Sequence, residues 1–339
     1  MKKILVACPS IKSPFVAQDV DSLKQSFAVN YISFDTLSNP KTLSVPITVL
    51  RKLIFKRYDA LLIWFSIPKF SAPLSFIAKL FGKKVFVIAG GYDITYVPEI
   101  DWGEMGIWWK RLLQRFSFFW TDHIFAFSDF SKSDIIKYTR PDKVSTLYFG
   151  IDTDFFSPEG SKENLVITTC FNINKTSILQ KGLNYFRNCA EALPEYNFIV
   201  IGQIDKNDAY AMDFYNCAPK NLSFTNRFVG NEELRDYYRK AKIYIQASAH
   251  EGFGIAVAEA MACQCIPIGA INTSLDEVIG NPKYIANFKN IDSVIELIRS
   301  IMISNNTGAD MRQRVSECFK PIFREKNLNT KIKNILKVI

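Results

Sequence analysis

The sequence is poor in the residue type that most often carries acid–base chemistry. Its 339 residues include only two histidines, His123 and His250. The seven cysteines are dispersed along the chain, and no C-x-x-C pair occurs. An odd number of scattered cysteines is typical of reduced thiols rather than of a disulfide framework. We therefore expect a cytoplasmic protein whose thiols are free and mostly buried.

Long apolar runs and an early glycine-rich turn are also missing. No run approaches the roughly 20 residues that a membrane-spanning helix needs, and the apolar start at residues 4–8 is too short for a signal peptide. Residues 9–14 follow the first expected strand, and they contain no glycine. A Rossmann phosphate loop at that place would be glycine-rich. The sequence thus predicts a chain that is soluble or lies on a membrane surface.

Hydrophobic and basic residues are plentiful. Hydrophobic residues make up 48% of the chain and aromatic residues 14%, which is typical of a well-packed globular protein. The length is enough for two domains. The net charge of +9 suits acidic partners such as nucleotide phosphates or anionic lipid. Because the basic residues are scattered, no nucleic-acid partner is expected.

Short apolar runs alternate with helix-like segments along the whole chain, which is typical of βα units and parallel sheets. The runs cover residues 3–8, 29–34, 60–65, 84–88, 165–170, 197–202, 243–245 and 266–270. A linker is expected near 155–163. We predict an α/β protein with two Rossmann-like, doubly wound parallel-sheet domains, at residues 1–155 and 163–320, which face each other across a cleft.

The chain is organised around residues 248–262, where an apolar strand, a turn and a helix follow one another. Gly252 and Gly254 let the backbone approach a ligand closely, and the start of the helix offers free amides to an anion. Glu251 and Glu259 flank this anion site, where carboxylates suit hydroxyl groups better than phosphate. A diphosphate with a sugar at each end fits the arrangement. A strand–turn–helix with two glycines also occurs in α/β proteins that bind nothing there.

This stretch resembles the E-x7-E signature of the retaining glycosyltransferases of family 4, which have the GT-B fold. Glu251 and Glu259 match the two acidic positions, and the blocks EGFG and EAMA match in full. The resemblance implies transfer of a sugar from a nucleotide-sugar to a glycan, lipid-linked or protein acceptor. It also implies retention of the anomeric configuration, no metal and no further cofactor. The terminal segment 321–339 would cross back to the first domain.

The resemblance assigns roles in the second half. Glu251 would hold the transferred sugar, Glu259 the ribose hydroxyls, and Lys181 the diphosphate. The amides of Gly252, Phe253 and Gly254 would also face the diphosphate, and His250 would shape the turn or touch the sugar. Gly202 and Gly230 stand at strand ends beside the donor. The family's arginine is absent from the loop expected at 171–177, where Lys175 is the candidate substitute.

In the first half, the resemblance rests on the strand at 84–88 and the turn that follows it. Gly90 and Gly91 stand where relatives carry a His-Gly sequence, and Asp93 is the titratable group that remains. Asp93 is a sugar- or acceptor-binding candidate, with a turn or helix-capping role as the alternative. Asp152 and Asp154 form a D-x-D sequence that precedes the linker, so we do not interpret it as a metal site.

Residues 107–120 predict an amphipathic helix. Trp108, Trp109, Leu112, Leu113, Phe116, Phe119 and Trp120 fall on one face, with Lys110, Arg111, Gln114 and Arg115 opposite. We favour a helix that packs its apolar face on the sheet and keeps a wet basic face. The alternative is a peripheral helix whose apolar face reaches lipid.

Two other functions stay open. The missing arginine and histidine would suit a catalytically degenerate protein that binds a sugar-nucleotide without turnover. A GT-B nucleotide-sugar epimerase would need further acid–base groups, and two histidines make that less suitable. We expect a glycosyltransferase.

Overall fold

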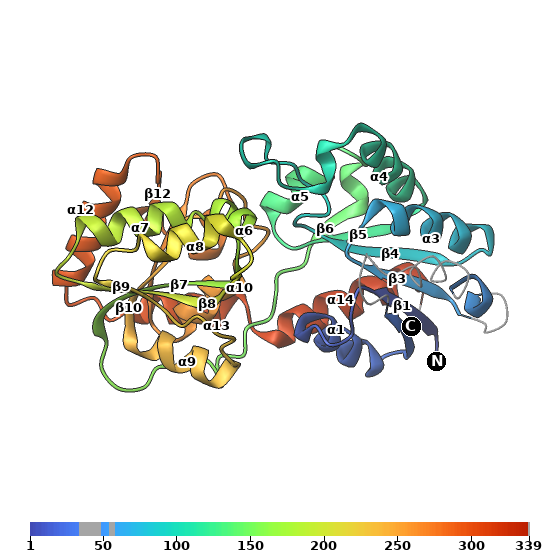
Figure 1. Ribbon diagram of the computed structural model, residues 1–339. Helices are drawn as coiled ribbons and strands as arrows, with labels where there is room; N and C mark the ends of the chain where they lie inside the picture. Colours follow the sequence, from blue (N-terminus) through green and yellow to red (C-terminus); the bar gives the residue numbers. More distant parts are fainter. Residues whose placement is uncertain (34–48, 54–57, 338–339) are drawn as a thin grey trace. The chain divides into compact units, whose positions relative to one another are not determined.

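The computed structural model describes residues 1–33, 49–53 and 58–337. The chain divides into two compact units, one formed by Met1–Phe149 with Pro321–Ile339 and the other by Gly150–Lys320. The division falls after Phe149, ahead of the linker expected at 155–163. Figure 1 shows the helices and strands of each unit.

The first unit is built on a parallel sheet with the strand order β2-β1-β3-β4-β5-β6. The strands are β1 (Lys3–Cys8), β2 (Ala28–Ser33), β3 (Ala60–Trp64), β4 (Lys84–Ala89), β5 (His123–Ala126) and β6 (Val144–Thr146). The helices are α1 (Pro14–Lys24), α3 (Pro68–Leu80), α4 (Trp108–Trp120), α5 (Asp129–Ile135) and α14 (Pro321–Leu336), with short 3-10 turns η2 (Pro98–Ile100), η3 (Glu104–Gly106) and η4 (Pro141–Lys143). In Figure 1, α1 and α14 lie on one side of this sheet, and α3 and α4 lie on the other.

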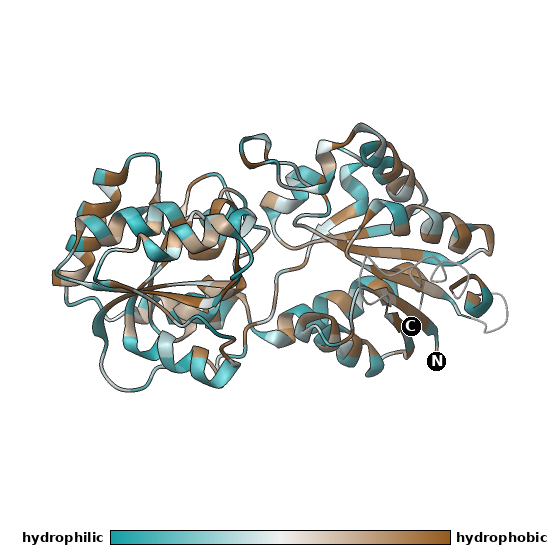
Figure 2. Ribbon diagram, in the orientation of Figure 1, coloured by the Kyte–Doolittle hydropathy of each residue, from teal (hydrophilic) through white to brown (hydrophobic). Residues whose placement is uncertain are grey.

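Several strands of this sheet are apolar along almost their full length because helices cover both faces. Every residue of β3 is buried, and so are residues 4–8 of β1 and 85–89 of β4. A parallel sheet covered on both faces has no solvent side, so its strands are continuous apolar runs. Figure 2 shows this concentration of hydrophobic residues in the strands.

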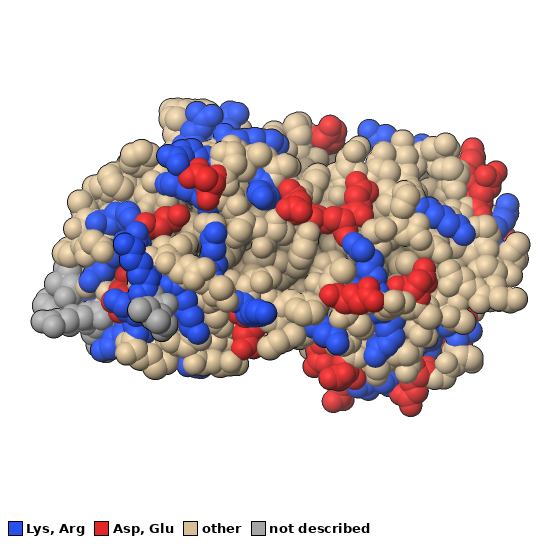
Figure 3. All heavy atoms as spheres, turned by 180° about the vertical axis from the view of Figure 1, so that it is seen from behind, with Lys and Arg blue, Asp and Glu red and all other residues tan. Residues whose placement is uncertain are grey.

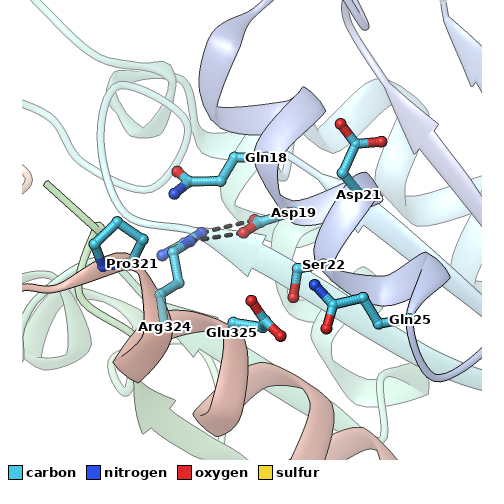
Figure 4. Close-up of a pocket in the computed structure, with 8 residues that line it drawn as sticks. All are labelled: Gln18, Asp19, Asp21, Ser22, Gln25, Pro321, Arg324 and Glu325. Carbon is cyan, nitrogen blue, oxygen red and sulfur yellow. Dashed lines mark hydrogen bonds and ion pairs between the residues drawn. The ribbon is translucent and has the colours of Figure 1, made fainter. Parts of the chain in front are cut away.

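Helix α14 is fixed to the first unit by a buried charge pair (Figure 4). The guanidinium of Arg324 donates to both carboxylate oxygens of Asp19 at 2.7 Å, and both side chains are 2% exposed. Arg324 also donates to the carbonyls of Leu147 and Tyr148, and the indole of Trp64 donates to Asp19 at 2.8 Å. A cavity of about 300 Å³ borders the pair. The last helix therefore anchors the segment that precedes the second unit.

The second unit repeats the architecture with the strand order β12-β11-β10-β7-β8-β9. Its strands are β7 (Glu163–Ile173), β8 (Asn197–Ile204), β9 (Leu222–Phe224), β10 (Ala241–Gln246), β11 (Ile266–Ala270) and β12 (Ile285–Ala286). Its helices are α6 (Lys175–Lys181), α7 (Leu183–Ala192), α8 (Ala209–Asn216), α9 (Asn231–Lys240), α10 (Ile255–Ala262), α11 (Leu275–Ile279), α12 (Ile291–Ile303) and α13 (Ala309–Cys318), with the 3-10 turn η5 (Pro282–Tyr284).

The predicted fold class is confirmed. Each unit holds six parallel strands flanked by helices, as expected for two Rossmann-like domains. Among the described residues, no helix combines the length and the apolar character needed to cross a membrane.

The favoured orientation of helix 107–120 is wrong. The residues of α4 that are buried are Gln114, Ser117 and Phe118, whereas Trp108 is 66% and Phe119 is 69% exposed. The polar side is accommodated inside because Gln114 donates to Ser66 Oγ at 2.7 Å and Ser117 Oγ lies 3.2 Å from a serine hydroxyl of α3. Polar partners under the helix thus decide which face turns inward.

Candidate functional site

The strand order of the second sheet creates a switch point beside β7. β7 is the first strand of this unit and lies between β8 and β10, so later strands are added on both of its sides. Open parallel sheets bind ligands at the carboxyl ends of the strands next to such a point. The segments that follow β7 and β10 there are α6 and the turn at 247–254.

The turn before α10 has a fixed, glycine-dependent shape. Gly254 is the N-cap of α10 and has a φ of 92°, in the left-handed region. A Cβ atom at Gly254 would lie 2.5 Å from Leu275 Cδ2. Phe253 is buried, with its ring centroid 5.2 Å from that of Phe319. The first amides of a helix have no acceptor within it, so this rigid turn presents an anion-binding helix start.

Glu251 and Lys181 meet beside this turn. The Nζ atom of Lys181 lies 2.9 Å from Oε2 of Glu251, and the two side chains are 28% and 16% exposed. They come from the end of α6 and from the segment that follows β10. The structure therefore brings together the cation predicted for the diphosphate and the carboxylate predicted for the sugar. Both side chains keep a surface that a ligand can reach.

A chain of hydrogen bonds holds the Glu251 carboxylate in place. Ser248 Oγ donates to Glu251 Oε2 at 3.1 Å, and Gln246 Nε2 lies 3.3 Å from the same oxygen. Tyr244 donates to Gln246 Oε1 at 3.0 Å, and the Tyr244 hydroxyl lies 2.7 Å from Thr169 Oγ1. The contacts to the Glu251 carboxylate itself, from Lys181, Gln246 and Ser248, all fall on Oε2. The Oε1 atom accepts no hydrogen bond from the part of the chain that the structure describes, which leaves it for a ligand.

The joint between α6 and α7 braces the same turn. Helix α6 ends at Lys181 and α7 begins at Leu183, so Lys181 lies at the carboxyl end of a helix. Gly182 between them has a φ of 66°, and a Cβ atom there would lie 2.1 Å from the Ala247 carbonyl oxygen. The Gln180 amide side chain donates to the carbonyl of His250, whose side chain is 4% exposed. His250 is thus a buried part of the turn.

Glu259 lies in the second turn of α10. Its Oε2 atom accepts a hydrogen bond of 3.3 Å from the hydroxyl of Tyr238. Burial raises the pKa of Glu259 from 4.5 to about 8, although the Tyr238 hydrogen bond opposes the shift. At neutral pH this pKa favours the protonated carboxyl group, which accepts from Tyr238 and carries a proton of its own.

Lys175 lies at the opposite end of α6 from Lys181. Its amide donates to Asp208 Oδ2 at 2.9 Å, and its Nζ atom lies 6.0 Å from the ring centroid of Tyr210. Lys181 stands six positions after Lys175 in the helix, a rise of about 9 Å. The long loop predicted at 171–177 is wrong, because β7 runs on to Ile173 and Asn174 caps α6.

A cavity of about 620 Å³ opens at the carboxyl ends of β7 and β8. It is lined by Phe171, Asn172, Gln203, Ile204, Asp205, Lys206, Asn207 and Asn226. Gly202 allows the two strands to approach, because a Cβ atom there would lie 1.7 Å from the Cys170 carbonyl oxygen. Gly230 is the N-cap of α9, which begins at Asn231.

The first-unit candidates form a separate, closely packed turn after β4. Asp93 is 3% exposed, and its carboxylate accepts the amides of Ser66 at 2.8 Å and Gly91 at 3.0 Å. Burial raises the pKa of Asp93, although these amides oppose the shift. A Cβ atom at Gly90 would lie 2.8 Å from the Phe127 ring. Asp93 therefore holds the turn together through backbone amides.

The D-x-D sequence also forms a turn. Asp152 Oδ1 accepts the amides of Asp154 and Phe155, each at 3.0 Å. Such a carboxylate-to-amide contact is typical of an Asx turn. Within residues 1–33, 49–53 and 58–337, no group of three or more His, Cys, Asp and Glu side chains is arranged to hold a metal ion.

The residues that support Glu251 were missed by the sequence analysis. Tyr244, Gln246 and Ser248 alternate along β10 and its extension, so they point to one side. Three polar residues at alternate positions at the end of a buried strand are a signal that could have found them. The cavity residues Phe171 and Asn226 carried no comparable pattern.

Comparison with known proteins first defines the class of fold. The structure of a sucrose-phosphate synthase from Thermosynechococcus elongatus has a TM-score of 0.79 at 12% identity, with 100% of each chain covered. The Anabaena protein Alr3699/HepE, solved with UDP and glucose, has a TM-score of 0.74 at 14% identity, again with 100% of each chain covered. The chain thus has the GT-B fold.

The sequence comparisons then concern the second unit. Residues 152–317 match the sequence model of the family described as Glycosyl transferases group 1, so this half carries such a domain. The serotype-specific mannosyltransferase WbdA of Escherichia coli is 26% identical over 178 residues, which are 47% of this chain and 22% of WbdA. The O-antigen chain mannosyltransferase B of the same organism is 35% identical over 68 residues, 20% of this chain and 18% of the relative. The matches therefore span about a fifth of these curated relatives.

Proposed function

We propose that the protein transfers a sugar from a nucleotide-sugar donor to an acceptor hydroxyl group. The observation that carries the proposal is the Lys181–Glu251 pair beside the rigid turn at the start of α10. The group 1 domain over 152–317 supports it. Family 4, which the signature resembles, adds the finer proposals of retained anomeric configuration and independence of metal.

In this mechanism the donor diphosphate lies against the first amides of α10. Lys181 exchanges part of its contact with Glu251 for a phosphate oxygen. Its charge then stabilises the diphosphate as the bond to the anomeric carbon breaks. The acceptor oxygen forms the new bond to that carbon, and its proton passes to the leaving phosphate. Because a lysine and helix amides supply the positive field, the proposal needs no metal ion.

The two glutamates bind hydroxyl groups at the two ends of the donor. Glu251 accepts hydrogen bonds from the transferred sugar through Oε1, while its Oε2 stays in the hydrogen-bonded chain. Glu259 contacts the ribose hydroxyls. Its raised pKa of about 8 means that the neutral carboxyl meets these hydroxyls at neutral pH. A neutral carboxyl beside the diphosphate avoids like-charge repulsion.

Candidate donors and acceptors follow from the relatives. A mannose or glucose nucleotide is the first choice, because similar proteins are mannosyltransferases or were solved with UDP and glucose. The acceptor is a glycan, a lipid-linked sugar or a protein, and the predicted location is cytoplasmic. Contact of residues 107–120 with a membrane would bring the enzyme to a lipid-linked acceptor.

A second candidate function is sugar-nucleotide binding without turnover. It is favoured by the absence of an arginine from residues 171–177, where relatives place a second cation for the diphosphate. A lysine at that site is a point charge without the forked geometry of arginine. Loss of this contact would weaken stabilisation of the leaving group more than it weakens binding.

One experiment separates the two functions. The protein is incubated with nucleotide-sugars labelled in the sugar, with and without acceptor extracts, and free nucleotide and labelled product are measured. Release of nucleotide with label in the acceptor supports transfer, and saturable binding without release supports the binder. Glu251→Ala should reduce transfer, with Glu296→Ala on an exposed face of α12 as the matched control. Transfer by Glu251→Ala at an undiminished rate would contradict the site.

A further inference from the structure

Helix α4 and the end of α3 form an exposed apolar surface, which we call the α3–α4 surface. Its members are Ile107, Trp108, Trp109, Leu112, Phe116, Phe119, Leu80 and Phe81. Trp108, Leu112 and Phe119 are 66%, 55% and 69% exposed. Single exposed apolar residues are common on soluble proteins, but a contiguous group of this size marks an interaction site.

The exposure follows from how α4 is fixed to the unit. Gln114 and Ser117 are held from inside by hydrogen bonds to Ser66 and Ser75, and Phe118 belongs to the hydrophobic core. Turning the helix over would bury the tryptophans but leave these polar partners without hydrogen bonds, which is costly. The apolar face is therefore held outward by the fold.

The surface is continuous across the two helices. The ring of Phe76 on α3 lies 5.7 Å from Phe116 and 5.5 Å from Trp120, measured between centroids. Leu80 stands one turn after Phe76 on the same face of α3 and is 66% exposed. Phe81 follows it and is 41% exposed. Aromatic contacts thus join the exposed side chains of α3 and α4 into one surface.

The charges on these helices are of one sign. Within their bounds α3 and α4 carry Lys69, Lys79, Lys110, Arg111 and Arg115 and no carboxylate. Arg111 and Arg115 are exposed and border the apolar face of α4. Figure 3 shows Lys and Arg side chains over the upper part of this unit, with acidic side chains among them, and Lys79 and Lys110 are paired with Asp122 and Glu104. Positive charge next to exposed tryptophan suits an anionic lipid surface.

We propose that the α3–α4 surface docks on the headgroup region of an anionic bilayer. Tryptophan and phenylalanine enter the interface, where amphipathic aromatic rings are favoured, and Arg111 and Arg115 contact lipid phosphates. An acidic protein partner would pair with the arginines but would also need to cover two tryptophans and two phenylalanines that are spread along α4. A bilayer interface covers them all without specific shape.

Docking at this surface would place the enzyme next to its acceptor, and this part of the proposal rests on the proposed function. The segment between β4 and α4 is tied to the turn of Gly91 and Asp93, because the Glu104 amide donates to the Tyr92 carbonyl at 2.9 Å. Trp108 and Trp109 at the start of α4 therefore lie on the carboxyl side of the sheet, where substrates of open α/β sheets bind. Docking would bring that edge to a lipid-linked acceptor.

Vesicle flotation tests the docking separately from transfer. The full chain is mixed with vesicles of phosphatidylcholine alone or of phosphatidylcholine with phosphatidylglycerol, without donor or acceptor. We expect flotation with the anionic vesicles, a loss of about tenfold or more in partitioning for Trp108→Ser with Phe119→Ser, and about fivefold for each of Arg111→Gln and Arg115→Gln. Ile303→Ser with Ile322→Ser is the control for exposed apolar residues elsewhere, and it should float normally.

The outcomes decide between occupants of the surface. Unchanged flotation of Trp108→Ser with Phe119→Ser, or equal flotation with neutral vesicles, overturns the proposal. Sedimentation measures the oligomeric state of the wild-type chain and of this double variant. A wild-type dimer that becomes a monomer in the variant would identify a second copy of the chain as the occupant, and it would also overturn the proposal. Glu251→Ala should float like the wild type. If the wild-type chain floats but transfers nothing, the docking stands and the proposed reaction is contradicted. If the wild-type chain transfers sugar but does not float, the docking alone is contradicted.

Discussion

Each unit contains an ion pair, and the two pairs differ in how far they are exposed. Arg324 and Asp19 in the first unit are each 2% exposed and are joined by two hydrogen bonds of 2.7 Å. Lys181 and Glu251 in the second unit are 28% and 16% exposed at the switch point of the sheet. The closed pair holds a helix in place. The open pair also joins a cation to a carboxylate but keeps surface for a donor, so accessibility separates a structural ion pair from a candidate site.

The largest effect is expected from breaking the closed pair. Arg324→Ala leaves the Asp19 carboxylate buried without its cation, and loss of one partner of a buried pair costs about 3–5 kcal/mol. We expect the free energy of unfolding of the first unit to fall by that amount, measured by urea denaturation. Removing both charges with Asp19→Asn and Arg324→Met should recover most of the loss. A loss confined to about 0.5 kcal/mol in Arg324→Ala would show that the pair is not closed.

The open pair should respond in activity rather than in stability. Lys181→Met removes the cation proposed for the leaving diphosphate, and loss of one such stabilising group lowers turnover by about 10²–10³-fold. The urea midpoint should shift little, because a partly exposed ion pair contributes about 0–1 kcal/mol. Turnover is measured by nucleotide release, with Lys289→Met on the surface as the control. Equal activity in both variants would remove Lys181 from the mechanism.

The sequence named both members of the open pair as site candidates, but neither their contact nor the residues that support it. Glu251 and Lys181 follow from a resemblance, because the signature and the Lys-Gly block are local strings. Their support comes from Tyr244, Gln246 and Ser248, whose common direction depends on a strand extending past its apolar run. Such extension depends on neighbouring strands. The alternation of polar residues was visible in the sequence, but only the sheet shows that these side chains point toward Glu251.

Helix α4 shows a different limit. Its periodicity predicted correctly that one face is apolar and the other polar, and the helix forms where expected. Periodicity does not say which face turns inward. That choice depends on Ser66 and Ser75, which come from other segments and offer hydrogen bonds to Gln114 and Ser117. Partners brought together only by the tertiary fold overrode the general rule that apolar faces are buried.

A third effect concerns Glu259 and pH. Its folded pKa of about 8 lies above the ordinary value of 4.5, so between these values the folded state holds a proton that the unfolded state has lost. The free energy of unfolding therefore falls as pH rises from about 4.5 to about 8. Glu259→Gln keeps the neutral shape and should flatten this fall, measured by urea denaturation across the interval. Glu296→Gln should leave the slope unchanged, and an unaltered slope in Glu259→Gln would contradict the raised pKa.

The smallest effects are expected from two hydrogen-bonding side chains, one that contacts Glu251 of the open pair and one on α14, the helix that carries Arg324 of the closed pair. Ser248→Ala removes one hydrogen bond to Glu251, worth about 0.5–1.5 kcal/mol, so turnover should fall a few-fold because the carboxylate is held less firmly. Asn329→Ala removes the contacts that α14 makes with Ser22 in the first unit, and it should lower the unfolding free energy by a similar amount with turnover unchanged. Nucleotide release and urea denaturation are measured on both variants. If Ser248→Ala changes only stability, or Asn329→Ala changes turnover at full folding, the division between an open binding network and a closed structural one is wrong.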